Sequence, residues 1–440
     1  MIETRGHTGD SKRLIVKVSF FALVLALLMG IFALFAVPEL FDDLLTFGGL
    51  QLRYALVTLF FFAVAYTVSV RRVSIRSRVY LCIVILQTVL MTAIGVLQRS
   101  QIIFQWRILG YDLFVLGGYI CGMLLALNQP AWRMMQFIRL AYLLWLCGLL
   151  VDSMLLAFGI IPPVWLGDPR VHVWAEFTCI EGLLLALPYL LHPSLQRGPR
   201  LLRGEFLGLI GLIAVFIVNL AMGARSVLIQ VVVATLLCLP LYARRLPRTL
   251  LYSGVVLLSI GVGVFAQYSP ALSQNYAVQR LQQTDVQDEE RTVEIGLLLS
   301  YIGWHAVFGL GNGSGFPSIT VREGEDFAAY PHLSILAPFQ KGGIPAMAVF
   351  VFSPLAMLLI VLSRRGFSPL QQEAATSALL YLLYSCMSGT WVFPMWVFFG
   401  IGVGYCFYGK SSMARQLAAS AKIVKAPPCP PLRSPSQNPA

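Results

Sequence analysis

The chain has 440 residues, of which 58% are hydrophobic and only 12% are charged, and its formal net charge is +12. Soluble domains carry about 25% charged residues, so this composition excludes an ordinary soluble protein and indicates an integral membrane protein. The positive charge requires no nucleic-acid partner. Most of it lies in short loops between apolar stretches, where it sets the topology and faces anionic membrane lipid.

Twelve stretches are apolar enough to cross a bilayer, for which a helix needs roughly 20 residues. They lie at 14–37, 51–70, 79–98, 108–127, 137–161, 175–191, 205–222, 226–243, 249–267, 333–362, 374–390 and 392–409. We keep the first as a span, because it lacks the small-residue cleavage site of a secretory signal. The sequence thus predicts an all-α polytopic membrane protein with about twelve transmembrane helices in a single transmembrane domain, residues 1–410.

Lys and Arg residues occur in every second loop, for example at Arg71 and Arg72 and again at Arg364 and Arg365. Cytoplasmic loops are the basic ones, so both termini are expected in the cytoplasm. The proline-rich residues 411–440 predict a disordered cytoplasmic tail. The long polar loop between spans nine and ten, residues 268–332, then lies outside, which is the periplasm if the cell is Gram-negative.

This outer loop has a predicted structure of its own. Acidic residues at Asp288, Glu289 and Glu290 are typical of a helix start, and apolar residues continue to Phe308. The length corresponds to about five helical turns. Glycines at 309, 311, 313 and 315 are expected to end the helix, because glycine tolerates positive φ and close backbone approach.

The glycine run resembles a phosphate-binding loop only in composition. It lacks the Gly-Lys-Ser/Thr ending of a nucleotide-binding loop and faces away from cytoplasmic ATP. We interpret it as a turn that packs closely, and keep Gly311 and Gly313 as candidates for a supporting role in substrate binding. The eight cysteines show no metal-ligand or disulfide spacing, so they indicate neither a zinc site nor a disulfide framework. No metal or other cofactor is predicted.

Nine basic residues fall on the outer side of this topology, and eight are arginine. They are Arg53, Arg99, Arg107, Arg170, Arg225, Arg280, Arg291, Arg322 and Lys341. The guanidinium group suits bidentate binding of phosphate or carboxylate, so one interpretation is an outward cavity for an anionic group, with Arg170 and Arg280 among its binding residues. The alternative is that several pair with outer acids such as Asp168, Asp288 and Glu294, or extend to the membrane interface.

Two residues are better placed for chemistry than the rest. Arg225 lies in the hairpin Met222–Ser226, which is so short that the arginine must sit at the outer end of two adjoining spans. His332 directly follows Pro331 at the mouth of the tenth span, where an imidazole can accept or donate a proton. His172, expected beside the same cavity, and His305 are its outer-side rivals.

The acidic residues within the predicted spans do not identify a further catalytic residue. Asp112, Asp152 and Glu181 lie within or near the outer halves of spans, where charge is costly and usually faces a cavity or a partner. They are candidates for orienting arginines or lining a path, and the sequence selects none of them as a catalytic acid or base.

The chain resembles the O-antigen ligase and polymerase family of bacterial envelope glycan enzymes over about residues 205–362. The matching pieces are the Arg-Ser hairpin at Arg225, the helix after Arg291 that leads to the Gly-x-Gly turn at Gly311 and Gly313, and His332 opening a span that ends in a Gly-Ile turn. This chain has His-Leu where the family often has His-Asn, and Gln340-Lys341 where it often has an acid. Arg280 rather than Arg291 is an alternative for the second family arginine.

The resemblance implies glycosyl transfer from an undecaprenyl diphosphate-linked glycan at the outer face of the inner membrane. Arg225 and Arg291 would hold the diphosphate without a metal, and His332 would orient or deprotonate the acceptor hydroxyl. We expect an O-antigen ligase, whose acceptor is the lipid A core. The alternatives are a polymerase, whose acceptor is a second lipid-linked glycan, and, from another class, a lipid-linked glycan flippase or transporter, against which the absence of repeated halves argues.

Overall fold

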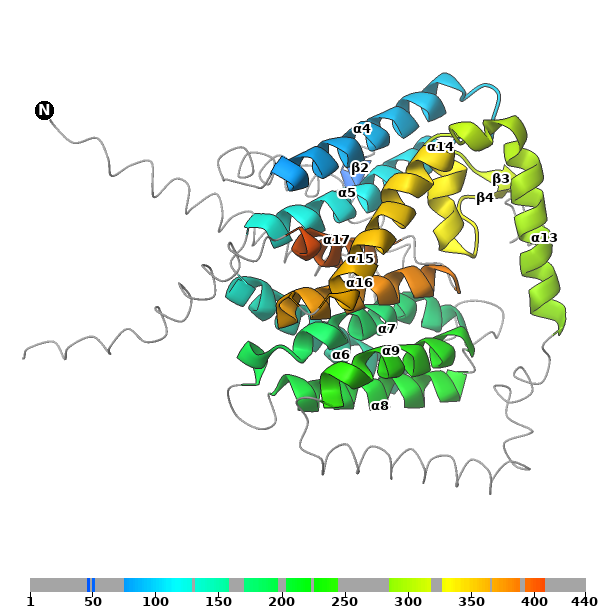
Figure 1. Cartoon of the computed structure of the whole chain (residues 1–440). Helices are drawn as coiled ribbons and strands as arrows, with labels where there is room; N and C mark the ends of the chain where they lie inside the picture. Colours follow the sequence, from blue (N-terminus) through cyan, green and yellow to red (C-terminus); the bar gives the residue numbers. More distant parts are fainter. Residues whose placement is uncertain are drawn as a thin grey trace, which may run out of the picture.

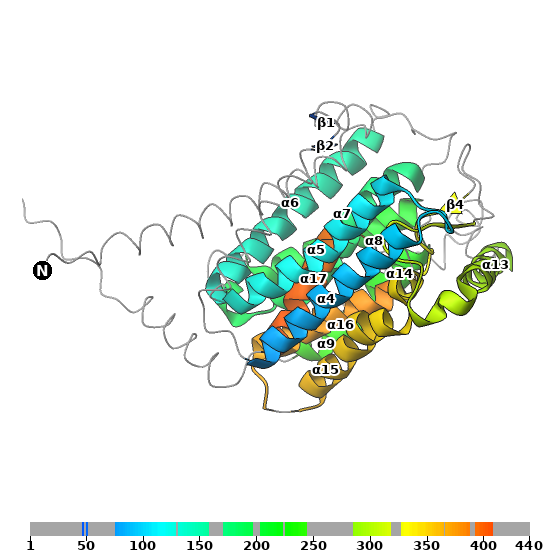
Figure 2. The ribbon, with the colours of Figure 1, turned by 90° about the horizontal axis from the view of Figure 1, so that it is seen from above.

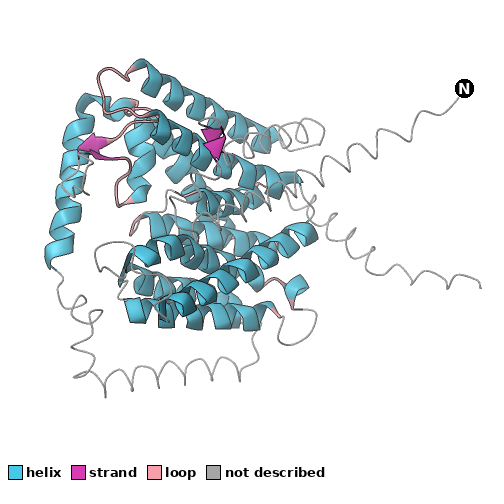
Figure 3. Ribbon diagram, turned by 180° about the vertical axis from the view of Figure 1, so that it is seen from behind, coloured by secondary structure: helices cyan, strands magenta, loops and turns pink. Residues whose placement is uncertain are grey.

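The computed structural model describes residues 46–47, 50–51, 75–128, 131–157, 170–196, 203–222, 225–243, 285–317, 327–364, 366–387 and 392–407. The predicted spans 14–37 and 249–267, almost all of 51–70, and the predicted tail lie outside these ranges. Helix dominates the described residues (Figure 3). Strands form two short antiparallel pairs: β1 (Thr46–Phe47) with β2 (Leu50–Gln51), and β3 (Phe316–Pro317) with β4 (Phe327–Ala328).

The predicted spans within these ranges are helices whose ends agree with the predictions to within about six residues. They are α4 (Ile75–Leu97), α5 (Trp106–Asn128), α6 (Ala131–Ala157), α7 (Arg170–Leu190), α8 (Gly204–Met222), α9 (Arg225–Ala243), α16 (Pro369–Ser385) and α17 (Phe393–Cys406). Within the described part of the chain, Ile75–Leu97, Trp106–Leu127 and Ser334–Ser363 are long and apolar enough to cross a membrane.

Short connections make successive helices antiparallel, so the bundle has two distinct ends (Figures 1 and 2). Its centre is α5, which packs along α17. A Cβ on Gly122 of α5 would lie 2.0 Å from the carbonyl oxygen of Val397, and one on Gly400 of α17 would lie 2.1 Å from that of Tyr119. Glycine therefore lets these two backbones approach closely, as small residues do between membrane helices.

The predicted span 333–362 is a bent series of helical segments and not one regular helix. It runs through η4 (Ser334–Leu336), α14 (Ala337–Met347), the π-helical turn η5 (Ala348–Phe352) and α15 (Ser353–Ser363). Gly343 inside α14 has φ 60° and ψ −151°, a conformation that side chains disfavour. The Gly-Ile turn noted in the sequence thus bends this span and does not end it.

Helix α13 (Asp285–Ile302) lies across one end of the bundle, at a steep angle to the other helices (Figure 1). It begins three residues before the predicted start, and it passes into the 3-10 turn η3 (Gly303–Val307) before the glycine run. Leu298 and Ile302 on its inner side form a small separate core with Leu310 and Phe316. We call this end, where α4 stops and α5 starts, the α13 end.

Candidate functional site

A carboxylate and an imidazole form a pair at the α13 end. Nδ1 of His332 lies 2.9 Å from Oε2 of Glu294, and the backbone N–H of His332 donates to both carboxylate oxygens, at 3.2 and 3.3 Å. The Glu294 side chain is 10% exposed, whereas that of His332 is 50% exposed. The pair therefore has a buried acid and an imidazole open to an incoming ligand.

The helix explains why Glu294 is in this place. Glu294, Leu298 and Ile302 follow each other at intervals of four residues, so they share the face of α13 that is turned inward. Leu298 and Ile302 bury this face against the small core. Glu294 extends the same buried stripe by one turn, which carries its carboxylate to the loop that contains His332.

The hydrogen bond with Glu294 gives the two ring nitrogens of His332 different roles. An ionised carboxylate only accepts hydrogen bonds, so Nδ1 is the nitrogen that carries the proton toward Glu294. Among the described residues, the hydrogen bonds of this ring are those with Glu294. Nε2 of a neutral ring then has a lone pair available for the proton of a hydroxyl group, the arrangement of a base oriented by an acid.

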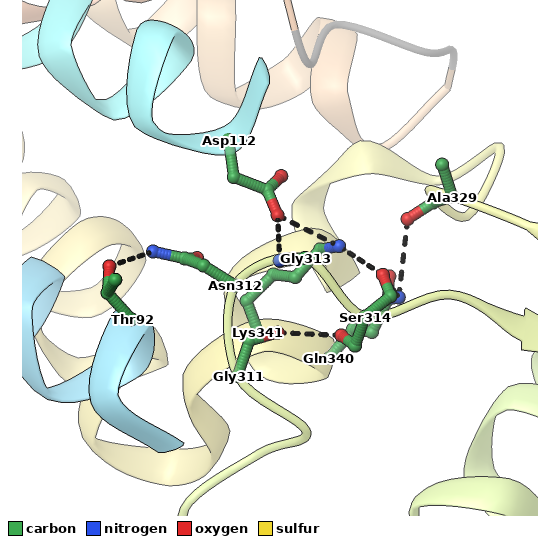
Figure 4. A network of polar contacts seen from close by, with 9 residues as sticks. All are labelled: Thr92, Asp112, Gly311, Asn312, Gly313, Ser314, Ala329, Gln340 and Lys341. Carbon is green, nitrogen blue, oxygen red and sulfur yellow. Dashed lines mark hydrogen bonds and ion pairs between the residues drawn. The ribbon is translucent and has the colours of Figure 1, made fainter. Parts of the chain in front are cut away.

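A second polar assembly lies beneath this surface, inside the bundle. Nζ of Lys341 on α14 is 3.2 Å from Oδ2 of Asp112 on α5, and both side chains are fully buried. The lysine also donates to the carbonyl oxygen of Ser314, and the same Asp112 oxygen accepts from the N–H of Gly313 at 2.7 Å. Figure 4 shows this network. The sequence left two interpretations of the outer basic residues, binding of an anionic group or pairing with an acid. Lys341 pairs with an acid.

The glycine run is the part of the loop that this network holds. Gly311 and Gly313 are buried and have φ values of 85° and 86°. The N–H of Gly311 donates to the carbonyl oxygen of Lys341 at 2.9 Å, and that of Asn312 donates to Met91 of α4 at 2.9 Å. The turn and close packing predicted for this run are confirmed, whereas contact of Gly311 or Gly313 with a substrate stays a prediction.

The remaining candidates are placed only in part. Arg225 is the first residue of α9, and the N-terminal end of this helix lies toward the α13 end of the bundle (Figure 1). Arg291 lies in α13, three residues before Glu294, while Arg170 and His172 lie in the first turn of α7. The side chains of these four residues, and all of Arg280, lie outside the described part of the structure.

Sequence reasoning treated Glu294 only as an acid available to pair with an arginine, and it did not connect Asp112 with Lys341. The available signal for Glu294 was its four-residue spacing from the inward-facing Leu298. Asp112 and Lys341 each stood out as a charge in or beside an apolar stretch. Within the described residues, no group of three or more His, Cys, Asp or Glu side chains is arranged to hold a metal ion.

One comparison with known proteins finds a match, and the matched segment includes the hairpin at Arg225, the outer loop and the first half of the bent span. Residues 209–351 match the sequence model of a family described as O-antigen ligase. No curated protein and no solved structure matches the chain. The matched segment contains Arg225, Arg291, Glu294 and His332 together with Lys341. The chain is therefore a helical membrane protein in which residues 209–351 are similar to the O-antigen ligase family.

Proposed function

We propose that the protein is an inner-membrane glycosyltransferase that moves a glycan from undecaprenyl diphosphate to an acceptor hydroxyl at the periplasmic face. In this proposal the chain has about twelve spans and cytoplasmic termini, and the α13 end faces the periplasm. The observation that carries it is the exposed imidazole of His332 with Glu294 behind it, inside the matched domain. We place the O-antigen ligase, with the lipid A core as acceptor, ahead of the polymerase.

His332 acts on the acceptor in this reaction. Nε2 accepts the proton of the acceptor hydroxyl while the hydroxyl oxygen forms a bond to the anomeric carbon of the donor. The bond between that carbon and the phosphate oxygen breaks, and undecaprenyl diphosphate leaves with the electron pair. Glu294 fixes the ring orientation and stabilises the positive charge that the ring acquires, because its carboxylate is nearly buried.

Arg225 and Arg291 act on the donor. The leaving diphosphate gains negative charge as the glycosidic bond breaks, and the guanidinium groups neutralise it through paired hydrogen bonds. Their position supports this role. The first residue of α9 and a residue one turn before Glu294 come from different parts of the chain, and both helices reach the α13 end of the bundle. Arg170, His172 and Arg280 are proposed to line the same cavity.

The test is glycan transfer by purified variants. His332→Ala should lower the rate by about 100- to 10,000-fold, the usual contribution of a general base. Arg225→Ala and Arg291→Ala should lower it comparably. His305→Ala, another histidine of the same loop, and Arg364→Ala, an exposed arginine at the opposite end, should retain wild-type activity. Full transfer by the His332 variant would exclude this residue as the base.

The acceptor is tested in cells that lack the gene. Loss of a ligase leaves long glycan chains on the lipid carrier, whereas loss of a polymerase leaves single repeats, and gel electrophoresis of the envelope glycan separates the two outcomes. Transfer by the purified protein in detergent also tests the transporter alternative, because a transporter has no reaction to perform without two membrane sides.

A further inference from the structure

The segment from α13 through η3 changes character halfway along its length. Charged residues occur at Asp285, Asp288, Glu289, Glu290, Arg291 and Glu294, whereas residues 295–308 contain no Asp, Glu, Lys or Arg. One half of the segment is suited to water. The other half, which ends in the sequence Trp-His-Ala-Val-Phe, is not, although it belongs to the outer loop rather than to a span.

The apolar half exposes its large side chains. Trp304 is 77% exposed and Phe308 is 55% exposed, and Leu299 and Val307 are each about half exposed. The small core beneath α13 uses Leu298 and Ile302 on the other side of the segment, so these four side chains face away from the protein. Several large apolar side chains exposed close together in the sequence indicate a site of contact with another molecule or with a membrane.

This exposed surface continues onto a membrane span. The backbone of η3 lies against the bend of α14, where a Cβ on Gly343 would be 2.5 Å from the carbonyl oxygen of Val307. The next residue, Ile344, is 60% exposed on the outside of the span Ser334–Ser363. Leu299, Trp304, Val307, Phe308 and Ile344 thus form one surface, which we call the elbow surface.

We propose that the elbow surface is immersed in the interfacial layer of the bilayer leaflet at the α13 end, with membrane phospholipid as its partner. The continuity with Ile344 decides the choice of partner, because the outside of a span contacts lipid. Tryptophan prefers the headgroup level of a bilayer, which suits the exposed position of Trp304. The charged, N-terminal half of α13 then lies in water, and its apolar, C-terminal half contacts lipid.

This lipid contact fixes the distance of the Glu294–His332 pair from the apolar layer of the membrane. Glu294 is the last charged residue before the apolar half, so lipid contact at Leu299 and beyond holds the carboxylate just outside the apolar layer. A lipid-linked substrate presents its polar group at that level. The proposed lipid contact itself does not depend on the reaction, and its test requires no substrate.

The experiment places the photoreactive residue p-benzoylphenylalanine at Trp304 or Phe308 in the full chain, reconstituted in vesicles of phosphatidylethanolamine and phosphatidylglycerol. Irradiation should give protein–phospholipid adducts, detected by mass, in yields close to that at Leu359, which is exposed on the span helix α15. The same probe at Thr292, exposed on the polar half of α13, should give almost none.

Equal adduct yields at Thr292 and Trp304 would overturn the proposal, as would crosslinks from Trp304 to a second copy of the chain in place of lipid. A second measurement avoids any folding defect caused by the probe. In vesicles with brominated acyl chains, Trp304→Phe should remove a component of tryptophan fluorescence that the bromine atoms quench. An unchanged quenched fraction would contradict lipid contact at this residue.

Discussion

The Glu294 carboxylate contacts both the main chain and the ring of His332, and these contacts have different consequences. The bonds from the main-chain N–H hold the loop, whereas the bond from Nδ1 selects the tautomer and stabilises a protonated ring. A residue that only held the loop would be replaceable by any hydrogen-bond acceptor. The charge of the acid is needed only for the second task.

Two substitutions at this position separate the tasks. Glu294→Gln keeps an oxygen that accepts from Nδ1 and removes the charge, and Glu294→Ala removes both. Loss of a hydrogen bond to a charged group costs about 1.5 to 3 kcal/mol, so Glu294→Ala should lower kcat by roughly 10- to 100-fold. Glu294→Gln should lower kcat and leave KM unchanged.

Steady-state transfer kinetics measure both effects. Ser300→Ala is the matched control on α13, because its exposed hydroxyl bonds only to the carbonyl oxygen of Leu297 among the described residues. If both Glu294→Gln and Glu294→Ala have the kcat of the wild-type protein, Glu294 has no role in the reaction.

The ion pair of Lys341 and Asp112 leads to a prediction about stability. Removing one partner leaves a buried charge without compensation, which costs about 3 to 5 kcal/mol. Asp112→Asn and Lys341→Gln should each lower the free energy of unfolding by about this amount. The double variant should be more stable than either single one, because Asn can still accept from Gly313 and Gln can still donate to Ser314. Thermal unfolding in detergent measures the three variants, and strictly additive losses would contradict coupling of the pair.

At the scale of elements, the glycine run and α4 fit together through backbone atoms. A Cβ on Gly311 would lie 2.0 Å from the backbone nitrogen of Gly95, and a Cβ on Gly95 would lie 2.0 Å from the carbonyl oxygen of Asn312. Neither contact can be relieved by turning a side chain. The outer loop is therefore joined to the transmembrane bundle at a fixed place.

Gly311→Ala should accordingly lower the free energy of unfolding by more than about 1 kcal/mol, since the left-handed conformation alone costs an alanine that much. Gly296→Ala on α13 is the matched control. Its Cβ meets nothing within 4 Å, so it should raise the free energy of unfolding by about 0.5 to 1 kcal/mol through helix propensity. Equal thermal unfolding temperatures for the two variants would contradict the packing role of Gly311.

The elements were predictable to the extent that their signal is local. An apolar run of span length can be recognised from the sequence without knowledge of the residues that pack against it. The described spans therefore match their predicted ranges. The sequence indicated a Gly-Ile turn at Gly343 but not that it bends the span midway, and it did not predict the 3-10 turn after Ile302, because each feature depends on the other segment lying against it. The same reason applies to the polar contacts. His332 is 38 residues from its partner Glu294, and Asp112 is 201 residues from its partner Gly313, so both pairs followed from the fold alone.

At the scale of the whole molecule, the prediction concerns orientation. The basic loops should be cytoplasmic and the α13 end periplasmic. Alkaline phosphatase inserted within residues 268–284 should be active in cells, and a green fluorescent protein fused after residue 440 should fluoresce. An inactive phosphatase insertion together with a non-fluorescent fusion, in chains that reach the membrane, would reverse the topology and place the proposed site on the wrong side for its substrates.

The π-helical turn η5 has a consequence for movement inside the membrane. The hydroxyl of Tyr80 on α4 donates to the carbonyl oxygen of Val349 in this turn at 2.8 Å, and it lies 2.9 Å from the hydroxyl of Tyr119 on α5. Sliding α4 by one helical turn, about 5.4 Å, would break both of these hydrogen bonds. These bonds therefore oppose sliding of helix α4, which carries the backbone surface against which the glycine run packs.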